Sequence, residues 1–222
     1  MSREKDLALL GKVLCNHGGL LTDLCAKLDS DPTKWEPAFG RFLRGENPWL
    51  EIKRSMKVLR KLDQVAEFHG TDVFKVSDYL RLTPVSERAT ADLFIGYLCK
   101  IGENFLDKIE KDIPASRLRA YALKKESFDN LIFADLGGEE SAETTFFEMI
   151  ALMKAQGRGQ KGILLINDYP NIFYIRDAKG VLWAVYCRWY SNYGYWRVNA
   201  GSISSSYSGN AGGQVFRRDS GS

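Results

Sequence analysis

The chain has 222 residues, of which 45% are hydrophobic and 27% are charged, and its formal net charge is +3. This length suits one large domain or two small ones, and the composition is typical of a soluble globular protein rather than a disordered one. No apolar run approaches the roughly 20 residues of a membrane helix, so we expect no membrane partner. The first residues, Ser2–Asp6, are charged and have no signal-peptide apolar segment behind them, and the four cysteines stand far apart. Both features favour a reduced, cytoplasmic protein.

Residues 1–112 are expected to form a helical region. Apolar residues recur at helical spacing over 3–29, after Pro32, over 50–68 and over 89–106. In the 50–68 segment lysines and arginines occupy the opposite side, which is either a solvated surface or a nucleic-acid contact. The structure of residues 71–115 is the least determined by the sequence, because the short apolar runs there suit either a strand or the start of a helix.

Residues 113–222 are expected to form an α+β domain. Alternation of apolar and polar residues predicts a strand at 118–123, and Leu131–Leu136 is a second strand or buried run. A helix is predicted near 139–156. Further strands are predicted at 163–166, 171–177, 181–190, 195–199 and 214–217. Turn-forming residues at 177–180 and 191–194 predict hairpins. The predicted fold class is therefore α+β, with a helical N-terminal part and a mostly antiparallel C-terminal meander packed on one helix.

One face of this predicted sheet gathers tyrosines and arginines. Strand side chains point alternately to the two faces of a sheet, and apolar side chains occupy every second position of 181–190. The residues expected on the other face are Tyr174, Arg176, Tyr186, Arg188, Tyr190, Tyr195 and Arg197. Tyr and Arg are enriched where proteins bind partners, so these seven are the candidate ligand contacts. The alternative is that another part of the chain covers this face.

The positive charge is concentrated in the same part of the chain. Residues 157–222 hold eight Lys or Arg residues against three Asp, a net charge of +5, which leaves −2 on residues 1–156. A basic, aromatic-rich surface is typical of proteins that bind nucleic acid, because arginines contact phosphates and aromatic rings stack on bases.

Several segments resemble a family of uncharacterised proteins predicted from uncultured bacterial genomes. The segments that carry the resemblance are Phe42–Trp49, Leu136–Glu140, Asn171–Asp177 and Val215–Arg218. The family has no known activity, so the resemblance transfers no catalytic residue. It implies a bacterial, intracellular protein.

Three motifs contain the residue types of a catalytic or cofactor-binding site, but their positions in the sequence do not fit such a site. Gly157–Gly162 matches G-x-G-x-x-G, but it follows a helix and precedes a strand, the reverse of a dinucleotide site. Asp168, Asp177 and Lys179 have the residue types of a metal-dependent nuclease, although a hairpin turn explains the last two. Cys15, His17 and Cys25 do not have the spacing of a zinc site. We therefore expect no metal and no cofactor.

The sequence thus predicts a non-enzymatic binding module whose Tyr/Arg surface contacts a partner, with nucleic acid as the leading candidate. The alternatives are a protein–protein interaction scaffold and, as the enzyme alternative, the Asp168/Asp177/Lys179 nuclease.

Overall fold

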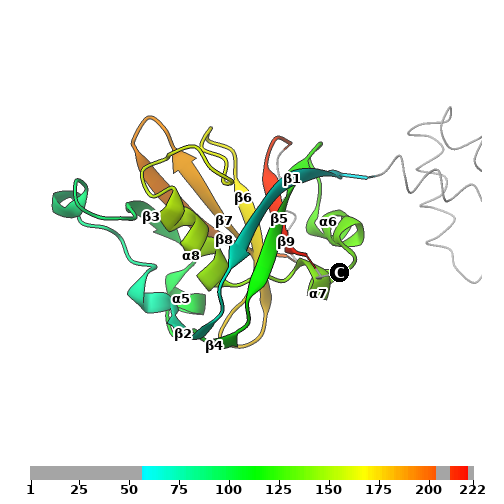
Figure 1. Ribbon diagram of the computed structural model, residues 1–222, viewed down its shortest axis with the longest axis horizontal. Coiled ribbons are helices and arrows are strands. Elements are labelled where there is room, and N and C mark those ends of the chain that lie inside the picture. Colours follow the sequence, from blue (N-terminus) through cyan, green and yellow to red (C-terminus); the bar gives the residue numbers. More distant parts are fainter. Residues whose placement is uncertain (1–56, 204–210, 220–222) are drawn as a thin grey trace, which may run out of the picture. The chain divides into compact units, whose positions relative to one another are not determined.

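A mixed sheet is at the centre of the part of the chain that this computed structural model describes, residues 57–203 and 211–219 (Figure 1). Within these residues the sheet has seven strands in the order β1-β5-β9-β6-β7-β8-β3. Their bounds are β1 (Leu59–Phe68), β3 (Ile95–Cys99), β5 (Ser116–Leu123), β6 (Asn171–Arg176), β7 (Leu182–Tyr190), β8 (Tyr195–Ser202) and β9 (Gln214–Arg218). The short strands β2 (Thr71–Lys75) and β4 (Ile109–Ile113) pair antiparallel in a separate sheet.

The predicted hairpins β6–β7 and β7–β8 are present and antiparallel, but the sheet is not a meander. β9 lies between β5 and β6, and it runs parallel to β6 and antiparallel to β5. β3 joins the far edge parallel to β8. The meander prediction is wrong because it considered only neighbours along the chain, whereas both parallel pairs join strands that are far apart in sequence.

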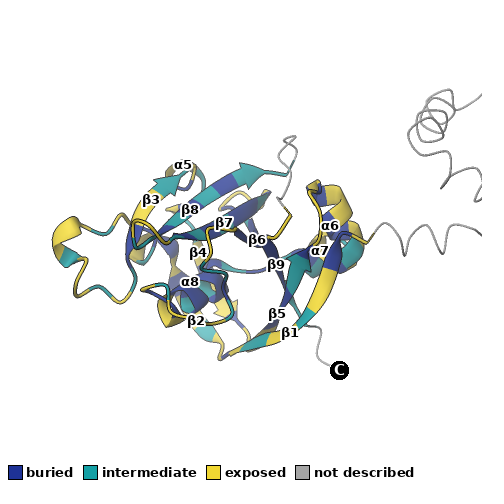
Figure 2. Cartoon of the chain, turned by 90° about the horizontal axis from the view of Figure 1, so that it is seen from above, coloured by how far each residue is buried: buried dark blue, intermediate teal, exposed yellow. Residues whose placement is uncertain are grey.

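Helices cover the two faces of the sheet unequally. On one face α8 (Phe146–Ala155) packs its buried stripe against β6, β7, β8 and β9. On the other face α6 (Asp129–Leu136) and α7 (Glu139–Ala142) pack on apolar residues of β1, β5, β6 and β9. Figures 1 and 2 show α6 and α7 beside β1, β5 and β9, away from β8 and β3. Leu182 and Ala184 at the start of β7 belong to the same buried cluster, and the rest of the β7–β8–β3 part of that second face has no helix of the described residues over it.

The position of α8 is fixed by its N-terminus. Thr145 and Glu148 form a capping box, so the predicted helix at 139–156 is divided and α8 begins after Thr145. The buried Glu110 carboxylate accepts hydrogen bonds from the backbone N–H groups of Phe146 and Phe147, each at 3.0 Å. These acceptors satisfy N–H groups that the first turn of a helix leaves without a partner.

The prediction of a helical N-terminal part is wrong where the structure describes it. The segment predicted as a helix over 50–68 contains the edge strand β1, and the one predicted over 89–106 contains β3 and the short helix α5 (Gly102–Phe105). β1 is mostly exposed and has a register shift between Lys61 and Val65, so its apolar residues do not alternate as those of a regular strand. The predicted helices at 3–29 and after Pro32 lie outside the described residues.

The described residues from Val58 onward belong to one compact unit, Val58–Ser222. The predicted boundary between residues 112 and 113 falls inside β4. Leu131–Leu136, predicted as a strand or buried run, belongs to α6, which ends at Gly137 with φ of 94°. That left-handed conformation is the usual helix stop and favours glycine.

Candidate functional site

Five of the seven predicted contact residues lie together on the half of the sheet that α6 and α7 leave open. They come from the hairpin β7–β8, and their side chains are half-buried. Asn199 of β8 and Tyr97 of β3 lie on the same side. We call this set the Tyr/Arg face; its members are Tyr97, Tyr186, Arg188, Tyr190, Tyr195, Arg197 and Asn199.

The strand register places like residues directly across from one another. Arg188 of β7 is paired with Arg197 of β8, and Tyr190 is paired with Tyr195. Like charges at directly opposed positions of an antiparallel pair destabilise a sheet. Among the residues that the structure describes, no carboxylate forms an ion pair with either arginine. The two guanidinium groups are therefore a local concentration of uncompensated positive charge.

Aromatic rings hold Arg197 in place. Its guanidinium carbon lies 4.2 Å from the centre of the Tyr97 ring and 5.8 Å from that of Tyr190, and its Nη1 donates to the Tyr190 hydroxyl at 3.2 Å. Burial lowers the pKa of Arg197, but the hydrogen bond to Tyr190 and the electrostatic effects of Tyr190, Tyr97 and Cys99 together outweigh it and leave the pKa above its ordinary value. Arg197 is therefore a fixed cation.

The tyrosines form an aromatic cluster beside the two arginines. The rings of Tyr190 and Tyr195 are nearly parallel, with centres 5.9 Å apart and an angle of 11° between them. Tyr193, which is 60% exposed, lies 5.7 Å from Tyr195 and 6.3 Å from Tyr190. Tyr190 and Tyr195 are half-buried and stack on each other, whereas an exposed ring such as that of Tyr193 can stack on a nucleobase or another flat group.

A small hollow of about 110 Å³ lies between the arginines, lined by Tyr186, Arg188, Tyr190, Arg197 and Asn199. The Asn199 amide nitrogen donates to the Tyr186 hydroxyl at 3.2 Å, and the Asn199 Oδ1 is buried without a hydrogen-bond partner among the described residues. The two guanidinium groups and the Tyr190 hydroxyl around one hollow offer several donors to an anionic group.

The structure places the other two predicted residues, Tyr174 and Arg176 of β6, outside the Tyr/Arg face. Tyr174 is fully buried under α6, where its hydroxyl donates to Asp129 Oδ1 at 2.6 Å. Burial raises the pKa of Asp129, and the Tyr174 hydrogen bond offsets part of that rise. Arg176 forms an ion pair with Glu143 at 2.9 Å. The alternation of β6 was read correctly, but α6 and α7 cover this part of the face.

Two members of the Tyr/Arg face were not predicted. Asn199 is the next alternate residue of β8 after Tyr195 and Arg197, so continuing the alternating pattern two residues further along the strand would have predicted it. Tyr97 lies in a segment whose apolar spacing indicated a helix, and only its parallel pairing with β8 brings it beside Arg197.

The residue types of the proposed nuclease site are not brought together. Asp177 holds the β6–β7 turn, where it accepts hydrogen bonds from the backbone N–H groups of Lys179 and Val181 and from Trp183 Nε1. Burial raises its pKa, but these donors outweigh that effect and leave the pKa lowered. Asp168 precedes β6 and bonds to Ser191, so β6 separates the two carboxylates. Across residues 57–203 and 211–219 no three potential metal ligands cluster.

Two glycines of the G-x-G-x-x-G match, Gly157 and Gly159, allow neighbouring parts of the chain to pack closely against the backbone. A Cβ on Gly157 would lie 1.7 Å from the carbonyl oxygen of Asp92, and one on Gly159 would lie 2.2 Å from the Trp189 ring. Cys15, His17 and Cys25, whose spacing does not fit a zinc site, lie outside the described residues. Cys99 and Cys187 are free thiols, and burial raises the pKa of Cys187.

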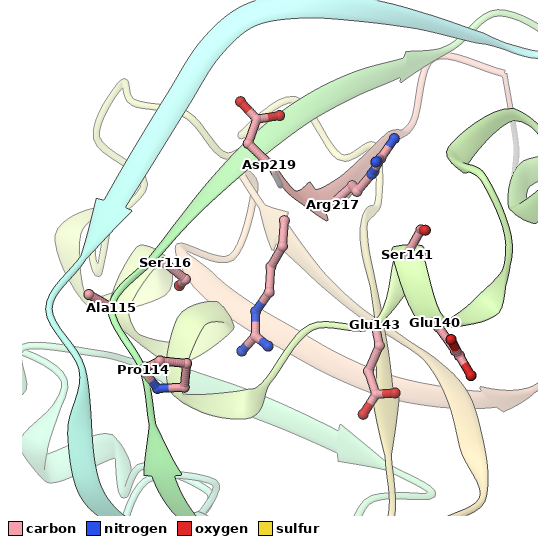
Figure 3. Close-up of a pocket in the computed structure, with 9 residues that line it drawn as sticks. Pro114, Ala115, Ser116, Glu140, Ser141, Glu143, Arg217 and Asp219 are labelled. Carbon is pink, nitrogen blue, oxygen red and sulfur yellow. The ribbon is translucent and has the colours of Figure 1, made fainter. Parts of the chain in front are cut away.

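A pocket of about 520 Å³ near the end of β9 has a different character (Figure 3). Its lining residues are Pro114, Ala115, Ser116, Glu140, Ser141, Glu143, Arg217, Arg218 and Asp219. Figure 3 shows the Glu140 and Glu143 carboxylates on the α7 side. Asp219 pairs with Arg119 at 2.7 Å, and Arg218 pairs with the buried Glu148 at 2.8 Å. The positive charge here is matched by carboxylates, unlike that of the Tyr/Arg face.

No helix among the described residues has the length and apolar character needed to cross a membrane. Comparison with protein-family models, with curated proteins and with solved structures finds no match to this chain.

Proposed function

We propose that this protein is a non-enzymatic module that binds single-stranded nucleic acid through its Tyr/Arg face. In this proposal phosphates of the strand contact Arg188 and Arg197, and a base stacks on the exposed ring of Tyr193. A reduced, cytoplasmic location fits the free thiols Cys99 and Cys187 and belongs to the same proposal.

The observation that carries the proposal is the direct pairing of Arg188 with Arg197, with no ion-paired carboxylate for either among residues 57–203 and 211–219. Opposed like charges cost a sheet a few tenths of a kcal/mol to about 1 kcal/mol, and a phosphate between them removes that repulsion. The hollow between the two side chains, about 110 Å³, has room for such a group.

The aromatic cluster favours a single strand over a duplex. Tyrosine faces stack only on bases that are not already stacked within a helix, and each such contact contributes about 1–3 kcal/mol. A flat sheet face with rings and arginines side by side fits an extended strand, whereas duplex DNA is bound mainly by elements that enter a groove.

The test is a titration of the full chain with fluorescent single-stranded and duplex oligonucleotides at two salt concentrations. The double variant Arg188→Ala/Arg197→Ala is expected to bind the single strand at least tenfold more weakly. Because two phosphate contacts are lost, the slope of log K against log salt should fall by about 1.4.

The matched control is Arg81→Ala/Arg117→Ala, which removes the same charge from two exposed arginines that pair with Glu87 and Glu67. It should bind as the parent protein does. Absence of single-strand binding at low salt would contradict the proposal, and so would equal losses in the two double variants. Either result would leave a protein partner as the explanation of the Tyr/Arg face.

A further inference from the structure

A second pocket lies at the tip of the β7–β8 hairpin, next to the tyrosine cluster. Its volume is about 470 Å³, within the range of small-molecule sites. Its lining residues are Val85, Ser86, Arg88, Ala89, Phe94, Gly157, Arg158, Trp189 and Gly194. The pocket thus combines two arginines with apolar and aromatic side chains, and none of its lining residues is acidic.

Both arginines are held in position by backbone carbonyls. Arg88 Nη2 donates to the carbonyl oxygen of Tyr193 at 2.7 Å, and its guanidinium lies over the Phe94 ring at 5.5 Å. Arg158 Nη2 donates to the carbonyl oxygen of Ala89. Each guanidinium has five N–H donors, so these bonds fix the groups while other donors stay free for an anion.

The glycine at the hairpin tip makes this arrangement possible. Gly194 has φ of 66°, and a Cβ there would lie 2.9 Å from Arg88 Nη2. A larger residue would push the Arg88 guanidinium away from the Tyr193 carbonyl.

The apolar side of the pocket offers a surface for a flat ring. Val85 is 81% exposed, and the buried Phe94 contributes the adjacent wall. The Phe94 ring also contacts Tyr195 edge-to-face, with ring centres 6.3 Å apart. Phe94 therefore contacts both this pocket and the Tyr/Arg face.

We propose that the pocket binds one nucleotide unit, with the phosphate on Arg88 and Arg158 and the base against Val85 and Phe94. That this nucleotide belongs to the strand on the Tyr/Arg face rests on the proposed function; binding of a free mononucleotide does not. The strand then turns around the hairpin tip at Tyr193 and Gly194.

The test is calorimetric titration of the full chain with AMP and with adenosine. AMP is expected to bind at least tenfold more tightly than adenosine, because adenosine lacks the phosphate. Arg88→Ala/Arg158→Ala is expected to reduce AMP binding at least tenfold. Arg60→Ala/Arg117→Ala, which removes the same charge from two exposed arginines of β1 and β5 outside both the pocket and the Tyr/Arg face, is expected to leave AMP binding unchanged.

A second variant covers the case in which loss of Arg88 and Arg158 loosens the loop they hold. Ser86→Trp introduces a large side chain at an exposed lining position and leaves both arginines and their hydrogen bonds in place. It should also abolish AMP binding, and its urea-unfolding curve should match that of the parent protein.

The experiments distinguish failure of the pocket proposal from failure of the proposed function of the Tyr/Arg face. No AMP binding at millimolar concentration overturns the pocket proposal, as does AMP binding that persists in both Arg88→Ala/Arg158→Ala and Ser86→Trp. If AMP binding behaves as expected while oligonucleotide binding is unaffected by Arg188→Ala/Arg197→Ala, the pocket stands and the proposed function fails.

Discussion

Asp129 and Tyr174 form a buried hydrogen-bonded pair where α6 packs on β6. The Tyr174 ring lies 4.5 Å from that of Phe133, and its hydroxyl is surrounded by apolar side chains apart from the Asp129 carboxylate. Because water does not reach this hydroxyl, its one bond to Asp129 replaces the hydration of both groups. Tyr174 thus anchors α6, while Tyr190 on β7 remains available to a ligand.

Tyr174→Phe is expected to lower the free energy of unfolding by about 2 kcal/mol, because the buried Asp129 carboxylate loses its donor. It should leave oligonucleotide binding unchanged. Urea unfolding measures the first effect and fluorescence titration the second. Tyr193→Phe, at an exposed ring, is the control and should unfold as the parent protein does.

The same variant should change the pH dependence of stability. The pKa of Asp129 is raised by burial above its ordinary value of 3.8, so between the two pKa values the folded state binds more protons than the unfolded state. The free energy of unfolding therefore decreases as the pH rises through this interval. Without the Tyr174 hydroxyl the folded pKa rises further and the decrease is larger. Parallel stability profiles for parent and variant between about pH 4 and pH 8 would contradict this account.

At the scale of single elements, the sequence predicted the strands and helices in which apolar residues recur at a regular spacing. Strand β5, the hairpins β6–β7 and β7–β8, and the buried stripe of α8 are present where alternation and helical spacing placed them. The sequence predicts helices in the segments that form the edge strands β1 and β3. Each strand is half-exposed and has a register shift, so its apolar residues do not alternate regularly. Edge strands contact the core on little of their surface, so their sequences carry a weak period-two signal.

The connection after α8 is expected to tolerate no side chain at Gly157. A Cβ there would lie 1.7 Å from the Asp92 carbonyl oxygen, and backbone atoms cannot move aside as a flexible side chain does. Gly157→Ala should lower the free energy of unfolding by at least about 2 kcal/mol, as other overpacked sites do. Gly102→Ala, whose Cβ would meet only Leu106 at 3.8 Å, is the matched control and should change stability by less than about 1 kcal/mol. Equal effects of the two substitutions in urea unfolding would contradict the packing role.

At the scale of the whole molecule, the strand order could not be predicted from neighbours in sequence. β9 is near the C-terminal end of the described residues yet lies inside the sheet, between β5 and β6. Its Phe216 ring is fully buried and stacks on Phe173 with centres 4.5 Å apart. Nothing in the local pattern of Gln214–Arg218 distinguishes this central strand from an edge strand. The openness of the Tyr/Arg face depends on the same global arrangement, since it is set by which strands α6 and α7 cover.

Deletion of residues 214–222 is expected to abolish cooperative unfolding, because β5 and β6 lose the strand between them. Tryptophan fluorescence and circular dichroism in a urea titration measure this. Deletion of residues 220–222 alone keeps β9 and Asp219, and it should unfold as the full chain does. A cooperative transition with an unchanged slope after the longer deletion would show that β9 is dispensable.

The central place of β9 also has a consequence for synthesis in the cell. β5 is translated some 90 residues before β9, a delay on the order of ten seconds at ordinary elongation rates, and β1 is translated earlier still. During that time the side of β5 that will pair with β9 exposes free N–H and C=O groups, and the apolar residues that face α8 have no complete sheet to cover them. The elongation rate over residues 124–213 therefore sets how long this edge of β5 lacks its partner strand.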